Sequence, residues 1–276
     1  MSSIKCLCGG NRLVLITKQK DARKVRDLNF CYLCGETFNA EDKTNYDHAP
    51  PETIFLGQDR NFPIKLKTHE TPCHSSMNLD DEVIGQLIRL LHREQPSKRD
   101  DKLKLKQYST ETGKTIVAFD VKNIEELVKR WLRGFHAALY RAALPKNSMF
   151  AIQTPFPSGV MKSGKLIVNP ILEQHCKFVE CIKRNRAANN LDFISSNNGK
   201  LKYECVWDQL NDKSWICIFA IDLYGWKDLG DVNNFQPRGC AGSYRLPTGN
   251  APAVASLSTQ LDFPFSNLDT ADPFSA

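Results

Sequence analysis

Residues 31–78 of the chain read CYLCGETFNAEDKTNYDHAPPETIFLGQDRNFPIKLKTHETPCHSSMN. This stretch contains three patterns of side chains that bind metals or protons: a Cys-x-x-Cys pair, an Asp-His dipeptide and a His-x-x-x-Cys-His cluster. No other part of the sequence holds such side chains as densely. We therefore expect the functional site to lie in this stretch.

The cysteine pair and the second cluster have the spacing of a structural zinc site. Two thiolates two residues apart can bind one ion, and Gly35, which follows them, permits the tight backbone turn that this requires. Further along, a histidine and a cysteine four residues apart can complete a tetrahedral set. The predicted zinc ligands are Cys31, Cys34, His69 and Cys73. Should His69 not serve, Cys6 or Cys8 is the next expected ligand.

The other polar groups of the stretch are suited to catalysis. Asp47 and His48 are successive residues of an expected strand, so their side chains face opposite ways. A carboxylate can bind a hard divalent cation such as Mg²⁺, and an imidazole can accept a proton from water near neutral pH. His74 directly follows Cys73, and neighbouring residues rarely bind the same ion. We therefore expect His74 to complete a second cation site with Asp47.

In these residues the chain resembles the HNH, or ββα-metal, endonuclease family. The family motif has Asp-His before an apolar-Pro segment, a middle Asn, and a terminal His or Asn after a zinc-knuckle cysteine. Here these are Asp47-His48-Ala-Pro-Pro, Asn61 and Cys73-His74. The segment MNLDDEVI at 77–84 is similar to the family's helix. The resemblance covers about 60 residues (28–92) and departs from the pattern at His69, where a cysteine is usual, and at Met77, where a basic residue is common.

The resemblance implies a zinc-stabilised ββα-metal core and the hydrolysis of phosphodiester bonds in nucleic acid, DNA being the expected substrate. It implies that His48 deprotonates the attacking water, and that Asn61 holds the loop and orients His48. It also implies that Mg²⁺ or another divalent ion, held by Asp47 and His74, polarises the phosphate and stabilises the leaving oxygen. By family analogy alone, such an enzyme serves in defence or in a mobile element.

The whole chain is predicted to be α+β. The expected parts are a nuclease domain at 1–95, a charged linker at 96–112, an α+β accessory or recognition domain at 113–240 and a partly disordered tail at 241–276. An amphipathic helix is expected after Asn123, with Pro145 as its end. Residues 201–207 and 215–221 are expected to form a β-hairpin, because both have strand-like apolar patterns with turn residues between them.

The charge of the chain is uneven. Its formal net charge is +6, and the central residues 111–200 carry most of the positive excess. A basic region suits a polyanion such as nucleic acid. The candidate phosphate contacts are Lys183, Arg184 and Arg186, in the stretch KRNRAANN. The alternative is that these cations belong to an ordinary solvated surface.

The composition argues against a membrane protein. The longest apolar runs, such as WICIFAI, are far shorter than the ~20 residues that cross a bilayer. The beginning of the chain has too short an apolar core for a secretory signal, so a cytoplasmic location with mostly reduced cysteines is expected. The alternative function is a non-catalytic, zinc-containing adaptor that binds nucleic acid or protein. The region after the linker is also a candidate surface for a partner protein.

Overall fold

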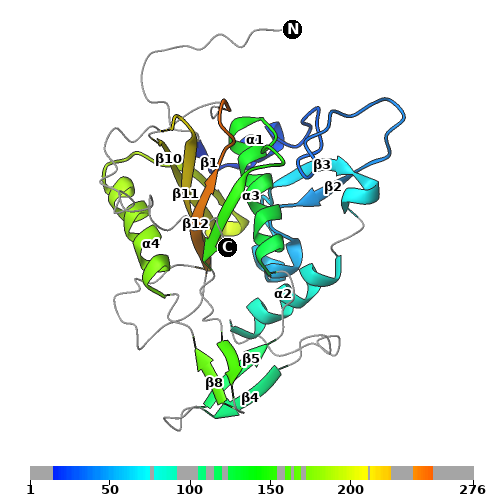
Figure 1. Cartoon of the computed structure of the whole chain (residues 1–276). Helices are drawn as coiled ribbons and strands as arrows, with labels where there is room; N and C mark the ends of the chain where they lie inside the picture. Colours follow the sequence, from blue (N-terminus) through cyan, green and yellow to red (C-terminus); the bar gives the residue numbers. More distant parts are fainter. Residues whose placement is uncertain are drawn as a thin grey trace.

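Six strands form the largest sheet, in the order β1-β9-β10-β11-β12-β6 (Figure 1). Their bounds are Leu15–Ile16 (β1), Asp192–Ser196 (β9), Leu201–Gln209 (β10), Trp215–Leu223 (β11), Gly239–Arg245 (β12) and Met149–Gln153 (β6). Neighbouring strands run antiparallel, except that β1 and β9 run parallel. The computed structural model describes residues 15–74, 78–91, 105–109, 115–119, 124–153, 159–162, 165–168, 172–210, 212–224 and 239–250.

A helix covers each face of this sheet. Side chains on alternate positions of a strand point to opposite faces. On β10, Tyr203 and Trp207 join the core cluster that includes α3 (Ile124–Tyr140), whereas Val206 joins the cluster that includes α4 (Leu172–Ala187). The rings of Phe135 on α3 and Tyr203 lie 4.6 Å apart. The sheet is therefore the central layer of an α+β architecture.

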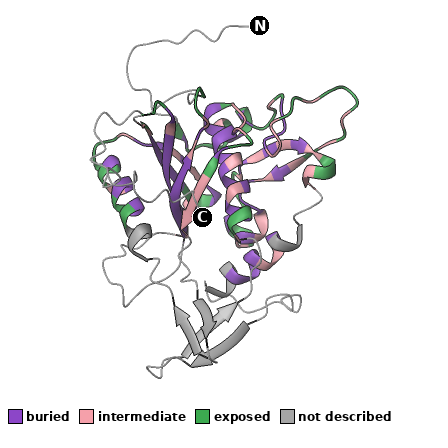
Figure 2. Ribbon diagram, in the orientation of Figure 1, coloured by how far each residue is buried: buried purple, intermediate pink, exposed green. Residues whose placement is uncertain are grey.

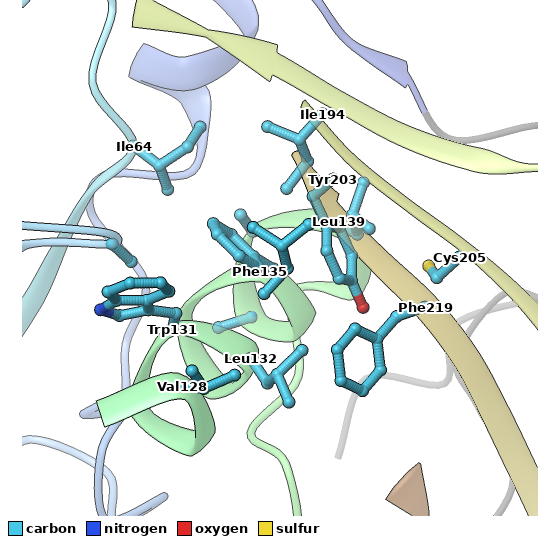
Figure 3. Close-up of a cluster of buried hydrophobic side chains, with 14 of the residues drawn as sticks. Ile64, Val128, Trp131, Leu132, Phe135, Leu139, Ile194, Tyr203, Cys205 and Phe219 are labelled. Carbon is cyan, nitrogen blue, oxygen red and sulfur yellow. The ribbon is translucent and has the colours of Figure 1, made fainter. Parts of the chain in front are cut away.

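The second important element is the hairpin of β2 (Thr44–His48) and β3 (Lys65–His69), which pair antiparallel with His48 opposite Lys65. Helix α3 lies between this hairpin and the large sheet, as Figures 1 and 3 show. Trp131 of α3 lies on the side of Ile64, which precedes β3, and Tyr203 lies on the far side. One cluster of buried side chains thus joins residues from both sides of the predicted linker.

The remaining elements are short or peripheral. They are α1 (Gln19–Lys24), the 3-10 turns η1 (Glu52–Ile54), η2 (Gly57–Asp59) and η4 (Asn197–Gly199), the π turn η3 (Glu70–His74), α2 (Asn78–Leu91) and the strand pairs β4 (Leu105–Ser109) with β5 (Thr115–Phe119) and β7 (Gly159–Lys162) with β8 (Lys165–Val168). Among the described residues, no helix has both the length and the apolar composition needed to cross a bilayer.

The structure confirms several expected elements and corrects two. The helix after residue 123 and the hairpin of β10 and β11 form as expected, although the helix ends at Tyr140, before Pro145, and the next residue, Arg141, takes a φ of 52°. Residues 105–109 of the predicted linker form a strand, because alternation favours β structure even in a lysine-rich segment. Residues 241–245 of the predicted tail belong to β12, and most of them are buried. Residues 251–276 lie outside the described residues, as do Cys6 and Cys8.

Candidate metal centre and histidine site

The four predicted zinc ligands lie together at one end of the β2–β3 hairpin. The ligand atoms of Cys31, Cys34, His69 and Cys73 all lie within 4.8 Å of one another. The Cys34 Sγ is 3.4 Å from the Nδ1 of His69. Three sulfurs and one imidazole nitrogen at such separations can surround a tetrahedral ion. The cluster could therefore hold a metal such as zinc.

Local backbone geometry brings the cysteine pair into place. The Cys31 N–H donates to the Glu36 carbonyl at 2.8 Å, and the Gly35 N–H donates to the Cys31 carbonyl at 2.8 Å. Gly35 has a φ of 80°, in the left-handed region that glycine adopts most readily. His69 enters as the last residue of β3, and Cys73 follows on η3. A strand end and two tight turns thus converge on one point.

The outer nitrogen of His69 has a carboxylate partner. Its Nε2 lies 3.3 Å from the Asp42 Oδ2, and the Asn39 N–H donates to the same Asp42 oxygen at 2.7 Å. The ring of Phe38 packs edge-on against the imidazole, with centroids 4.9 Å apart. A histidine that binds a metal through one nitrogen usually donates from the other to such a group, which fixes its orientation. This contact supports a metal-binding role for His69.

The thiols of the cluster have unequal proton affinities. Burial by itself raises the pKa of Cys31, but hydrogen bonds from Thr68 and from nearby backbone groups together lower it to about 7. Burial and the charges of Cys31 and Cys34 raise the pKa of Cys73 to about 12. Thiolates crowded in this way repel one another, and a bound cation removes that repulsion. This electrostatic arrangement is consistent with a metal centre.

His48 lies at the opposite end of β2, half-buried and facing away from the protein core. Its Nε2 is 3.7 Å from the Glu52 Oε1. Burial lowers the pKa of His48 below its ordinary value; the carboxylates of Glu52 and Asp47 oppose this shift, and the nearby Lys65 and His74 add to it. At neutral pH the imidazole is therefore uncharged and able to accept a proton.

Asp47, the neighbour of His48, faces the interior. Its carboxylate accepts from the Arg130 guanidinium, with Nη2 at 3.0 Å from Oδ1 and 2.9 Å from Oδ2. The Tyr32 hydroxyl donates to Oδ2 at 2.5 Å. Both oxygens are thus occupied, so an ion could bind Asp47 only by breaking a buried ion pair. The predicted pairing of Asp47 with His74 around a catalytic ion does not match this arrangement.

Arg130 connects α3 to two other elements. Its Nη1 donates to both carboxylate oxygens of Asp81 on α2, at 2.9 and 2.8 Å. Burial lowers the pKa of Arg130, but the carboxylates of Asp47 and Asp81 outweigh this and hold that pKa above its ordinary value. One guanidinium therefore joins β2, α2 and α3 in a buried network.

Two glycines let both helices approach the segment that follows His48. A Cβ on Gly134 of α3 would lie 2.4 Å from the Cβ of Ala49, and a Cβ on Gly85 of α2 would lie 2.7 Å from the Thr53 carbonyl oxygen. Real atoms do not approach so closely, so each position requires glycine or a shifted backbone. The Thr53 hydroxyl also donates to the Asp81 carbonyl at 2.9 Å. The segment from Ala49 to Thr53, which follows His48, is thus packed closely against α2 and α3.

The other predicted site residues lie elsewhere. Asn61 is exposed, and its amide donates to the Asn198 Oδ1 at 3.2 Å, which ties its loop to η4. Lys183, Arg184 and Arg186 lie on α4, across the large sheet from the hairpin (Figure 1). Arg184 pairs with Glu180 at 3.8 Å, and Arg186 forms a short ion pair with Glu204. The cations of this pattern are thus at least partly neutralised.

Sequence reasoning missed Asp42, Glu52 and Arg130. Glu52 lies four residues after His48, a short separation that could have drawn attention to it. Arg130 lies three residues after Leu127 and four before Gly134, on the apolar stripe of α3. A charge on such a stripe indicates a buried partner. Nothing local, however, identifies that partner as Asp47, 83 residues away.

No protein-family model, curated protein or solved structure matches the chain.

Proposed function

We propose that this protein is a metal-dependent endonuclease that hydrolyses phosphodiester bonds of nucleic acid, with DNA as the expected substrate. The observation that carries the proposal is the placement of His48. It is half-buried beside Glu52, and the ion pair of Asp47 with Arg130 fixes the strand beneath it. An uncharged imidazole so placed is suited to act as a general base.

In this proposal the chain's own groups have distinct tasks. His48 takes a proton from the attacking water. His74 and Glu52 are the groups near His48 that would hold a divalent cation such as Mg²⁺, which Asp47 would do only at the cost of its Arg130 pair. When bound, that cation would polarise the phosphate and stabilise the leaving oxygen.

The order of elements also supports the proposal. A β-hairpin (β2 and β3) is followed directly by the η3 turn and the helix α2. The ββα-metal family has the same order, and the Cys73-His74 dipeptide lies at the joint between hairpin and helix. Zinc bound by Cys31, Cys34, His69 and Cys73 would then fix the hairpin end, while Arg130 fixes its inner face.

The experiment that tests the proposal is the nicking of supercoiled plasmid by zinc-loaded protein. We expect relaxed circles to accumulate when Mg²⁺ or Mn²⁺ is added, and no cutting with zinc alone. Protein that binds nucleic acid but never cuts it with any divalent ion would contradict the proposal and favour the adaptor function.

A further inference from the structure

Three cations lie around the outer face of the β2–β3 hairpin: Lys65 and Lys67 belong to β3, and Arg26 lies over the ring of Tyr46. Buried and half-buried residues alternate along β3, and Figure 2 shows both classes on the hairpin. By strand alternation and register, Tyr46, His48, Lys65 and Lys67 share one side of the hairpin, opposite to buried Asp47 and Leu66. Cross-strand register places Lys65 opposite His48 and Lys67 opposite Tyr46. Residues directly opposite on one face have Cβ atoms about 5 Å apart. Lys65 is therefore an immediate neighbour of His48.

Aromatic rings lie between these cations. The Arg26 guanidinium lies 4.1 Å from the centre of the Tyr46 ring, and the Lys65 Nζ lies 5.9 Å from the same centre. The Lys67 Nζ lies 4.8 Å from the centre of the Phe38 ring. Such contacts hold the charged groups over the surface without neutralising them. We call Arg26, Tyr46, Lys65 and Lys67 the basic face.

Among the described residues, the cations of the basic face have no carboxylate within ion-pair distance. Within the part of the chain that the structure describes, no ion pair involves Arg26, Lys65 or Lys67. Two carboxylates lie on this side of the hairpin: Asp27 accepts a hydrogen bond from the Tyr46 hydroxyl, and Glu52 lies beside His48. On α4, by contrast, Arg184 and Arg186 face glutamates. Unpaired positive charge is what attracts a polyanion.

We propose that a nucleic-acid strand lies along the basic face, with its phosphates on Lys67, Lys65 and Arg26, and that this path brings one phosphate to His48. Lys65 and Lys67 are two strand residues apart, about 7 Å. This spacing is comparable with the separation of neighbouring phosphates along a strand. The choice of ligand rests on the proposed function, but the binding surface can be tested without catalysis.

The test is fluorescence anisotropy of labelled single-stranded and duplex oligonucleotides, titrated with zinc-loaded His48→Ala protein. The titrations are made between 50 and 200 mM salt, because binding through phosphate contacts weakens markedly over this range. In that background we compare Lys65→Gln/Lys67→Gln with Lys213→Gln, an exposed lysine in the β10–β11 turn, as the charge control. A Lys183→Gln/Arg184→Gln pair tests the α4 surface.

We expect the variant Lys65→Gln/Lys67→Gln to bind every sequence about tenfold more weakly or worse. We also expect the slope of log K against log salt concentration to fall in magnitude by about 2, one for each lost phosphate contact. We expect the Lys213 variant to bind like the parent. The proposal is overturned if the hairpin pair binds normally, if the α4 pair shows the larger loss, or if neither probe binds. Tight binding through the hairpin, together with no plasmid cutting by the wild-type protein, would support the binding surface and refute the nuclease.

Discussion

Asp47 and His48 are consecutive residues of one strand with opposite environments. Asp47 is 7% exposed and lies in a buried network with Arg130 and Tyr32. His48 is half-buried on the outer face, beside Glu52 and Lys65. The two residues of the Asp-His motif therefore differ in role: Asp47 fixes the strand against α3, and His48 is accessible from the outer face. Variants on the inner face should therefore cost stability, and those on the outer face should cost binding or activity.

The largest stability effect is expected on the inner side, from Arg130→Met. This change leaves the carboxylates of Asp47 and Asp81 buried without their common partner, which should lower the free energy of unfolding by about 3–5 kcal/mol. Urea denaturation measures it. Lys129→Met is the matched control, because Lys129 makes only partly exposed pairs with Glu125 and Glu126, worth about 0–1 kcal/mol. Equal losses in both variants would refute the buried network.

A smaller effect is expected at the candidate metal cluster that includes His69. Asp42→Asn removes the carboxylate that faces the His69 Nε2, and we expect zinc affinity to fall about 10- to 100-fold. Competition with a chromophoric chelator measures the affinity. Glu41→Gln removes an exposed neighbouring charge and should leave the affinity unchanged. A normal zinc affinity for Asp42→Asn would mean that His69 does not bind the metal through its Nδ1.

The smallest effect concerns a buried histidine outside the hairpin, His136 of α3, which contacts Tyr244 of the large sheet. Burial and the charge of Arg133 lower its pKa to about 3, whereas in the unfolded chain it titrates near 6.5. Between these two pH values the unfolded chain binds a proton on His136 and the folded protein does not. The free energy of unfolding is therefore highest above pH 6.5 and falls as the pH is lowered towards 3.

From pH 6.5 to pH 5 this linkage costs wild type about 2 kcal/mol. His136→Gln, which keeps a polar group for the Tyr244 hydroxyl at 3.2 Å, should lack that part of the pH dependence. Parallel urea titrations at the two pH values measure the difference. Identical pH profiles for the two proteins would show that His136 is hydrated or charged in the folded state.

The candidate metal cluster could be predicted because its ligands follow a recognisable spacing along the chain. The spacing of Cys31, Cys34, His69 and Cys73 is a property of the sequence, and the structure brings these four groups together. The opposite orientation of Asp47 and His48 followed from strand alternation. The pairing of Asp47 with Arg130 did not follow from the sequence, because it depends on how α3 packs across the hairpin.

The predicted tail at 241–276 was wrong for residues 241–245, which belong to β12. β12 consists largely of small residues, GCAGSYR, which resemble an unstructured tail. The structure explains them: a Cβ at Gly242 would lie 2.2 Å from the Ala151 carbonyl oxygen of β6. The close approach of these strands requires a residue without a side chain, and no pattern within β12 reveals which strand approaches it.

The proposal that His48 is the general base is tested by the plasmid-nicking rate of His48→Ala relative to wild type, with both proteins zinc-loaded and Mg²⁺ present. Because His48 lies on the outer face, we expect the variant to unfold at the same urea concentration as wild type. We expect its nicking rate to fall about 10²- to 10⁴-fold, the usual contribution of a general base. A His48→Ala protein that nicks plasmid at the wild-type rate would contradict the assignment of His48 as that base.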